Sequence, residues 1–258
     1  MRTKLILIFF IFASSTTRAD EIRIAVASNF RSPMVEIARL FEAESEHKIV
    51  VSYGASGKLF AQIINGAPID VFLSADQVKP QKLIERKLAI ADSQTTYGYG
   101  ALVLWSYQIS TLPLQDILVE SKGRIAMANP RLAPYGQAAL ETLRALSMIK
   151  PTQHRWVLGE NIAQTFHFVH SGNATIGFIA RSQLRDASKM RGTTWAVPPE
   201  LHTPIAQDAV ILTRAEHLIA ARSFIQFIGA ARAANIIEEH GYETTRATRD
   251  DPTRKRER

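Results

Sequence analysis

The sequence contains no cysteine among its 258 residues. This absence excludes disulfide bonds, and it also excludes zinc and iron–sulfur sites that depend on thiolate ligands. After the apolar run at residues 5–13 there is no comparable apolar run, no internal repeat and no low-complexity linker. The fold must therefore be stabilised by burial of apolar side chains, and the chain is long enough for two modest α/β lobes.

The charge of the chain is concentrated at its two ends. The formal net charge is +7 at pH 7, but Arg2, Lys4 and Arg18 lie within the first 19 residues, and residues 246–258 hold six basic residues against three acidic ones. Residues 20–245, between these two ends, are nearly neutral, which argues against a nucleic-acid partner. We expect residues 244–258 to form a disordered basic tail behind a fold that ends at Tyr242 and Glu243.

Residues 1–19 have the pattern of a secretory signal peptide. A basic start is followed by the apolar run and then by small residues, with Ala19 at the expected cleavage position before Asp20. A retained membrane anchor is the weaker alternative, because the run is too short to span a bilayer as a mature helix and no basic stop-transfer flank follows it. We therefore expect export to the periplasm.

Strand-like and helix-like segments alternate from residue 22 onward, which is typical of an α/β protein. Apolar residues at helical spacing predict a helix from Met34 to Phe41, a helix that ends at Asn65-Gly66, and a last helix over residues 222–237. The expected strands are residues 22–27, 49–53, 71–73, 101–105, 125–128, 176–180 and 206–213.

Two short loops, Ala27-Ser28-Asn29 and Gly54-Ala55-Ser56-Gly57, each follow an apolar run and precede a helical pattern. A strand that turns into a helix in this way leaves unpaired backbone N–H groups at the helix start. With the helix dipole and a serine hydroxyl, these donors form an anion site that needs no charged side chain. The loops therefore predict a protein that holds a small oxyanion, although either serine alone could be an ordinary N-cap.

Residues 66–76, Gly-Ala-Pro-Ile-Asp-Val-Phe-Leu-Ser-Ala-Asp, resemble the GAP-x-D-x-F-x-SAD signature of the periplasmic molybdate-binding proteins of ABC transporters. The loops at 25–30 and 54–57 are similar to the first two anion loops of that family, and those at 129–136 and 159–164 to the third and fourth. The Gly241-Tyr242 ending matches as well, so the resemblance extends in order over residues 21–243.

The resemblance implies a type II periplasmic-binding fold with two α/β lobes, two crossovers and a ligand cleft between the lobes. Lobe I would comprise residues 20–97 with 208–243, and lobe II residues 98–207. In the cleft, Ser28 and Ser56 would give hydroxyl and backbone donors, while Asn29, Tyr135 and Ile162 would act mainly through backbone N–H groups. The metal would be held as molybdate or tungstate by Ser28, Ser56, Tyr135 and Ile162, without direct metal ligands and without any cofactor.

In one branch of the family a tyrosine on the strand after the fourth loop completes the site, and Ala180 stands at that position here. This chain is similar to the other branch, which has a tyrosine in the third loop at Tyr135. The Tyr135 side chain could simply pack, and we expect it to be a lid rather than a ligand of the anion. Donors alone suit a dianion that carries no proton, and the single carboxylate of the four loops, Glu160, is expected to point to solvent from the first turn of its helix.

The favoured function is therefore an exported, monomeric binding protein, not an enzyme, that delivers its oxyanion to an ABC permease. A sulfate or phosphate receptor is the alternative within this class. A secreted serine hydrolase using Ser28 or Ser56 is the alternative from another class, but the chain lacks a G-x-S-x-G elbow. A ligand-sensing domain of a regulator is opposed by the signal peptide and by the lack of a DNA-binding module.

The other polar candidates have structural explanations. Asp70 is expected to fix a turn near the hinge and Asp76 to cap the following helix, and His167 and His170 are expected to lie on a solvated helix face because no third metal ligand stands out. Trp105, Trp156 and Trp195 are expected to pack in the cores.

Overall fold

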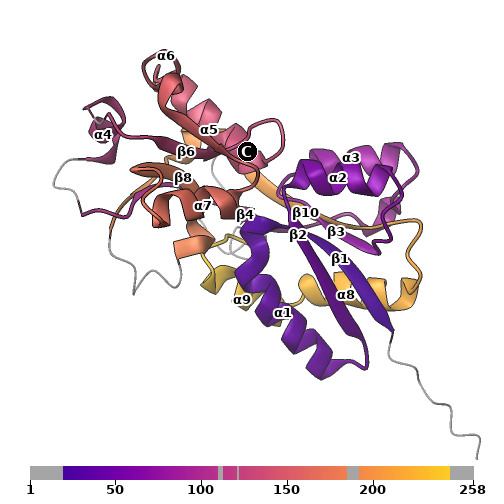
Figure 1. Cartoon of the computed structure of the whole chain (residues 1–258). Helices are drawn as coiled ribbons and strands as arrows, with labels where there is room; N and C mark the ends of the chain where they lie inside the picture. The colour runs from indigo at the N-terminus through magenta and orange to yellow at the C-terminus, as the bar shows by residue number, and fades with distance from the viewer. Residues whose placement is uncertain (1–19, 110–112, 121, 185–191, 245–258) are drawn as a thin grey trace, which may run out of the picture.

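The computed structural model describes residues 20–109, 113–120, 122–184 and 192–244, which form two α/β lobes (Figure 1). The expected signal peptide, and all of the expected tail except Thr244, lie outside the described residues. Within the described part, no helix is both long and apolar enough to cross a lipid bilayer.

The first lobe is built on a five-stranded sheet in the order β2-β1-β3-β10-β4. β1 pairs in parallel with β2 and β3, whereas β10 is antiparallel to both β3 and β4. The parallel strands therefore end at the same edge of the sheet, where the two serine loops begin. The strands are β1 (Glu21–Ala27), β2 (Lys48–Gly54), β3 (Val71–Leu73), β4 (Thr95–Gly100) and β10 (Ile205–Ile211).

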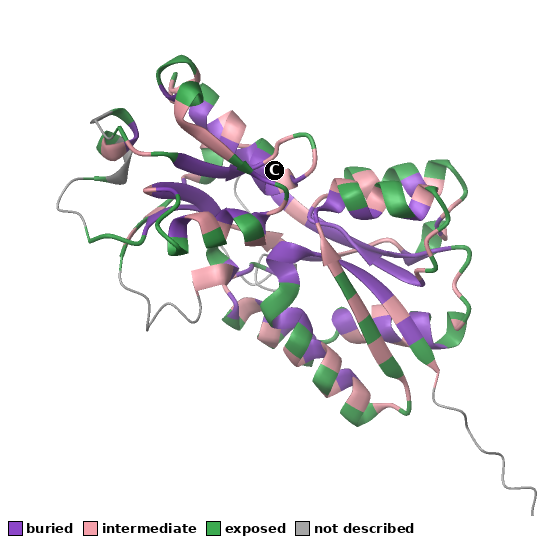
Figure 2. Ribbon diagram, in the orientation of Figure 1, coloured by how far each residue is buried: buried purple, intermediate pink, exposed green. Residues whose placement is uncertain are grey.

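Helices cover both faces of this sheet, as Figures 1 and 2 show. On one face, α1 (Arg31–Glu44), α8 (Leu218–Ile228) and α9 (Ala231–Glu239) bury an apolar core that includes Phe41 and Phe224. On the other face, α2 (Ser56–Ile64) and α3 (Val78–Glu85) pack Leu59, Ile63 and Leu83 against the sheet. The expected apolar stripe of the first helix is confirmed, because Met34, Ile37 and Phe41 are buried.

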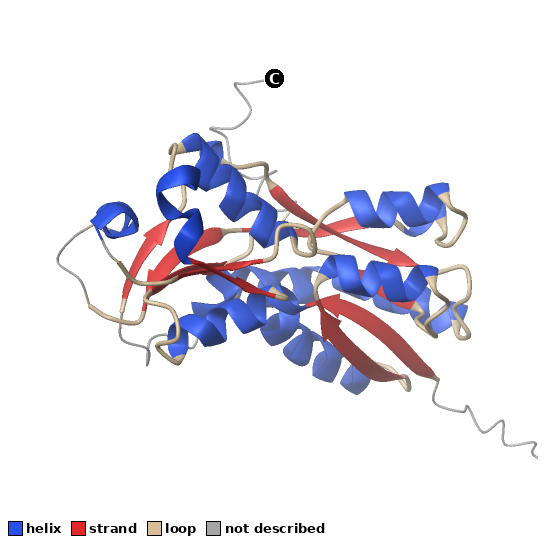
Figure 3. Cartoon of the chain, turned by 45° about the horizontal axis from the view of Figure 1, so that its top comes forward, coloured by secondary structure: helices blue, strands red, loops and turns tan. Residues whose placement is uncertain are grey.

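The second lobe has a five-stranded sheet in the order β7-β6-β8-β5-β9. Figure 3 shows the strands of the molecule in red with the helices around them in blue. β6 is parallel to β7 and β8, and β5 is antiparallel to β8 and β9. The elements are β5 (Leu102–Ser106), α4 (Leu114–Glu120), β6 (Ile125–Ala128), α5 (Pro134–Ala145), α6 (Ile149–Thr152), β7 (Trp156–Gly159), α7 (Ile162–His170), β8 (Ile176–Ala180) and β9 (Thr193–Ala196). Short 3-10 turns are η1 (Ser28–Phe30), η2 (Ala91–Ser93), η3 (Gln153–Arg155) and η5 (Pro199–Leu201).

The chain crosses between the lobes at the end of β4 and at the start of β10. Ile205 belongs to the core of the second lobe, whereas Ala209 and Ile211 belong to the core of the first. β10 is thus a strand shared by both cores. The proposed lobe boundaries at residues 97/98 and 207/208 fall inside β4 and β10.

Several sequence expectations are confirmed and others are wrong. Asn65 ends α2, and Gly66 after it has a positive φ of 89°. The expected single last helix over residues 222–237 is wrong, because the chain forms α8 and α9 with a break at Gly229 and Ala230. Glycine has low helix propensity and lets the chain turn there. The sequence interpretation also missed β4, β7 and β9, whereas the helix expected after Asp76 is present as α3.

Asp70 fixes local structure as expected, but not near the hinge. Its carboxylate accepts hydrogen bonds from the backbone N–H groups of Arg23 (2.7 Å) and Glu216 (2.9 Å). These contacts lie at the amino end of β3 and beyond the far end of β10, away from the crossovers. The carboxylate therefore links the backbone of β1, at Arg23, to the backbone of the segment before α8, at Glu216.

The tryptophans pack in or beside the cores as expected. Trp105 is buried and its ring stacks on Phe166 with centroids 5.2 Å apart, whereas Trp156 and Trp195 are partly buried against the apolar cluster of the second lobe.

The fold does not end at Tyr242. Glu243 and Tyr99 exchange two backbone hydrogen bonds of 2.7 and 3.0 Å, and Thr244 is buried, with its hydroxyl donating to Glu238. The segment after α9 therefore adds a short bridge to the edge of β4.

We predict that a chain ending at Tyr242 is less stable than one ending at Thr244. The loss of two backbone hydrogen bonds corresponds to about 2 kcal/mol, which lowers Tm by about 4–8 °C in a protein of this size. Differential scanning calorimetry of the two truncated chains measures the difference. Equal melting temperatures would show that the bridge adds nothing to stability.

Candidate functional site

The four predicted loops meet at one cavity between the lobes. Ser28, Asn29, Ser56, Tyr135 and Ile162 all line it, and none of them is more than 6% exposed. The cavity is small, with a free volume of about 10 Å³, which is on the scale of a single water molecule. The other lining residues are Ala27, Gly54, Ala55, Ala75, Ala133 and Pro134.

The two serines have free donor capacity toward this cavity. The Ser56 hydroxyl oxygen accepts a 3.0 Å hydrogen bond from the backbone N–H of Ala75. Because that bond uses only a lone pair, the hydroxyl proton is left for another acceptor. Ser28 is a buried residue with 6% of its surface exposed, and its hydroxyl group makes no hydrogen bond within the described part of the chain.

Two helix starts of the second lobe each present one uncommitted N–H group beside the cavity. In α7, the Asn161 side chain caps the helix by accepting from Ala163 and Gln164, each at 3.0 Å, which leaves the Ile162 N–H unused by the cap. In α5, Pro134 occupies the first position and has no N–H, so the Tyr135 N–H is the first donor of the helix.

Among the residues that the structure describes, no charged side chain lines the cavity. Glu160 lies outside α7, before its N-cap, and is not in the first turn as expected. Its carboxylate is partly exposed but does not simply point to solvent, because it pairs with Lys58 on α2 of the first lobe. The cavity therefore offers neutral hydroxyl and backbone donors.

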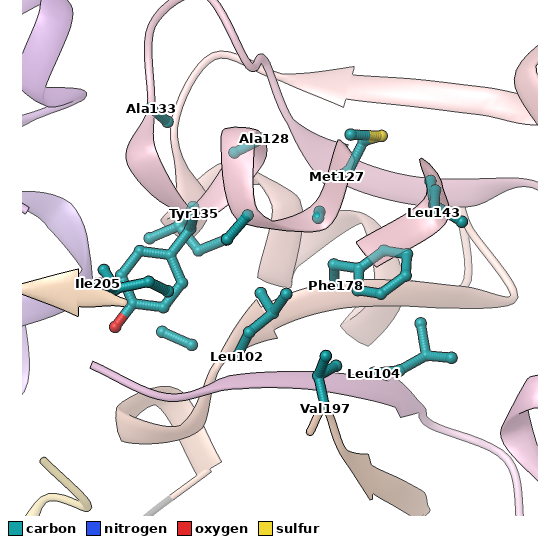
Figure 4. Packing of buried hydrophobic residues seen from close by; sticks show 14 of the residues in the cluster. Leu102, Leu104, Met127, Ala128, Ala133, Tyr135, Leu143, Phe178, Val197 and Ile205 are labelled. Carbon is teal, nitrogen blue, oxygen red and sulfur yellow. The ribbon is translucent and has the colours of Figure 1, made fainter. Parts of the chain in front are cut away.

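The Tyr135 side chain is not a lid. It is 2% exposed, and its ring packs beside Ile205 with the hydroxyl directed away from the apolar cluster (Figure 4). The hydroxyl accepts a 3.3 Å hydrogen bond from the side chain of Gln207 on β10. Only the backbone of Tyr135 is left for the cavity, and Ala180 is fully buried and does not line it.

Behind the cavity lies a buried polar network that sequence analysis missed. The side-chain amide nitrogen of Asn29 donates to the side-chain oxygen of Gln207 (2.8 Å) and to the Tyr242 hydroxyl (3.0 Å). The backbone carbonyl of Asn29 accepts from the hydroxyl groups of Tyr242 (2.8 Å) and Ser182 (2.9 Å). Tyr97 donates to the same Gln207 oxygen at 3.0 Å. The Asn29 side chain and backbone carbonyl are thus both bonded within the network, and only the backbone N–H of Asn29 is left for the cavity.

Burial keeps the tyrosines of this network protonated. It raises the pKa of Tyr242 to about 12, and it raises the pKa values of Tyr97 and Tyr135 well above the ordinary value. Their hydroxyl groups therefore act as neutral donors and acceptors that join the two lobes around β10.

The remaining candidates form no second site. His167 and His170 are exposed on α7, and no group of three or more His, Asp or Glu side chains within the described residues could hold a metal ion. Asp76 accepts from the Lys79 N–H at 3.0 Å, so it caps the start of α3 as expected, and it also pairs with the Lys79 ammonium group.

Comparison with known proteins supports the sequence interpretation. A family described as bacterial extracellular solute-binding protein matches residues 22–243. The molybdate-binding protein ModA of Azotobacter vinelandii is 40% identical over 228 residues, covering 87% of this chain and 90% of the relative. ModA of Rhodobacter capsulatus is 38% identical over 227 residues, covering 88% and 89%.

The solved periplasmic molybdate-binding protein of Azotobacter vinelandii has a TM-score of 0.81 with this structure at 34% identity, covering 86% of this chain and 98% of that chain. These matches confirm the two-lobed α/β fold and the resemblance to the molybdate-binding family.

We predict that the buried tyrosines destabilise the fold at alkaline pH. Their folded pKa values lie above that of an unfolded tyrosine, so the stabilisation is complete below about pH 10 and is lost as the pH rises toward 12. Each such tyrosine steepens the fall in the free energy of unfolding by up to about 1.4 kcal/mol per pH unit.

Urea unfolding between pH 9 and pH 11.5, for the native chain and for Tyr242→Phe, measures this slope. The Phe variant should show the shallower fall. Tyrosinate absorbance that reaches its full value while the circular dichroism stays native would contradict the prediction.

Proposed function

Because this chain belongs to the bacterial extracellular solute-binding proteins, we propose that it captures molybdate, or its analogue tungstate, in the cavity between its lobes. It works in the periplasm, acts as a monomer without catalysis or cofactor, and delivers the anion to an ABC permease. The observation that carries this proposal is the cavity itself, where residues from four loops converge without any charged side chain. Two relatives that align over most of the chain are named molybdate-binding proteins.

The donors suit a fully deprotonated oxyanion. Molybdate and tungstate are dianions at neutral pH and have no proton to donate, so a site made of donors leaves none of their oxygens facing an acceptor. The donors are the hydroxyl groups of Ser28 and Ser56 together with backbone N–H groups at Asn29, Tyr135 and Ile162. Helix starts stabilise negative charge through their unpaired N–H groups and their dipoles.

The hydrogen bonds that these donors can form are sufficient for binding in the micromolar range or tighter. A hydrogen bond to a charged group contributes roughly 1.5–3 kcal/mol. About six such bonds, after ordering and desolvation costs, are compatible with a binding free energy near −8 kcal/mol, which corresponds to about 1 μM or tighter.

The alternatives fit the cavity less well. Hydrogen phosphate would gain from a carboxylate acceptor, and no carboxylate lines the cavity. A serine hydrolase needs a general base beside its nucleophile, and the residues that line the cavity include no His, Asp, Glu or Lys. Sulfate remains the serious competitor, because it differs from molybdate mainly in its shorter bonds to oxygen.

We predict that the mature protein binds molybdate and tungstate at one site per chain, and sulfate at least about tenfold more weakly, a difference of about 1.4 kcal/mol. Titration calorimetry with molybdate, tungstate, chromate, sulfate and phosphate tests this ranking. Tighter binding of sulfate or phosphate than of molybdate would overturn the proposed function in favour of the rival receptor.

We also predict that Ser56→Ala weakens molybdate binding by about 1–3 kcal/mol, the value of one lost hydrogen bond to a charged group. The variant also removes the acceptor of the Ala75 N–H, so some loss of stability is expected. Ser93→Ala is the matched control, since this buried serine of the same lobe accepts from the Ile211 N–H at 2.9 Å and does not line the cavity.

Both variants should melt at lower temperature, but only Ser56→Ala should lose affinity. Equal affinity in the two variants would remove the Ser56 hydroxyl from the proposed set of donors.

A further inference from the structure

The first turn of α2 touches the opposite lobe at two consecutive residues. The backbone N–H of Gly57 donates a 2.8 Å hydrogen bond to the carbonyl oxygen of Leu132, in the loop before α5. The next residue, Lys58, pairs with Glu160 in the loop before α7. Ser56, directly before them, lines the cavity. The same turn thus provides a proposed ligand donor and the contacts that bring the lobes together beside it.

These contacts belong to a closed arrangement of the lobes. The five predicted site residues are almost completely buried although they come from both lobes. Because these residues are so deeply buried, we expect an anion to reach their donors after the lobes have moved apart, and the Gly57–Leu132 bond to form again when the cavity closes.

The approach of the two backbones leaves no room for a side chain at residue 57. A Cβ atom there would lie 2.9 Å from the Leu132 carbonyl oxygen and 3.1 Å from its Cα. Both are backbone atoms, so no rotamer change relieves the contact, and the loop or the whole lobe has to shift. The backbone of Gly57 itself is not in the left-handed region, and alanine has the higher helix propensity, so alanine fits α2 as such.

We propose that Gly57 is an affinity-determining residue whose missing side chain allows the lobes to close on the anion; this inference rests on the proposed function. A side chain at this position leaves each lobe intact but reduces the fraction of molecules that reach the closed form. The apparent affinity falls in proportion to that fraction, so a closed form populated one-tenth as often means about tenfold weaker binding.

The ion pair between Lys58 and Glu160 should contribute less to closure of the lobes than the backbone contact of Gly57. Lys58 and Glu160 side chains are 51% and 45% exposed, and solvent and salt screen such pairs. Closure therefore depends mainly on the backbone contact at Gly57, and Lys58→Met should change affinity much less than Gly57→Ala.

The test compares the full chain with Gly57→Ala and with Gly229→Ala as a matched control. Gly229 lies at the end of α8 in the same lobe and has φ −82°, and a Cβ atom at this position would approach its neighbours no closer than 3.6 Å. Calorimetry with molybdate gives the affinities, thermal melting without ligand gives the stabilities, and small-angle scattering at saturating molybdate gives the radius of gyration.

We expect Gly57→Ala to bind molybdate at least about tenfold more weakly, to melt without ligand at or above the temperature of the native chain, and to keep a larger radius when saturated. Gly229→Ala should bind like the native chain. A weaker affinity accompanied by a lower melting temperature of the free protein would overturn the inference, because it would indicate damage to α2.

If the native chain binds molybdate and Gly57→Ala has the same affinity and the same radius of gyration, the inference about Gly57 is overturned while the proposed function stands. A native chain that binds no oxyanion of the panel would overturn the proposed function, and this inference with it.

Discussion

The structure depends on backbone N–H groups that helix formation leaves without partners. Every helix has such donors in its first turn, and most proteins satisfy them with side-chain caps or water. Here the starts of helices from both lobes converge on one cavity. The Asn161 cap serves Ala163 and Gln164 but not Ile162, and Pro134 removes a donor altogether. Local capping chemistry therefore decides which donors remain for a ligand.

The polar network behind the cavity holds the backbone of two cavity-lining residues in place. Gln207 lies on β10, the strand that contributes to both cores, and it contacts Asn29 from the first lobe and Tyr135 from the second. Both residues turn their side chains into the network, so their backbones are fixed beside the cavity. A buried polar group costs free energy unless it is hydrogen-bonded, so these side chains have few alternative positions.

The parts of the fold that follow from local patterns were predictable. The apolar stripe of α1, the stop at Asn65 and the serine loops after β1 and β2 depend on residues near one another in sequence. The break between α8 and α9 was missed because apolar residues continue across Gly229, and β4, with the sequence Thr-Thr-Tyr-Gly-Tyr-Gly, has no apolar run. The lid expected of Tyr135 was wrong because its partner, Gln207, is 72 residues away. Contacts between residues so far apart in sequence arise from tertiary packing, and the spacing of residues along the chain does not predict them.

The absence of charged side chains from the cavity has a consequence for charge balance. The described residues that line the cavity include no Asp, Glu, His, Lys or Arg, so an oxyanion bound there as proposed would neither exchange a proton with a charged group nor meet a counter-charge. The loaded protein therefore carries the full charge of its cargo, and its isoelectric point and electrophoretic mobility differ from those of the empty protein. An empty and a loaded form would therefore be distinguishable by their electrostatics alone.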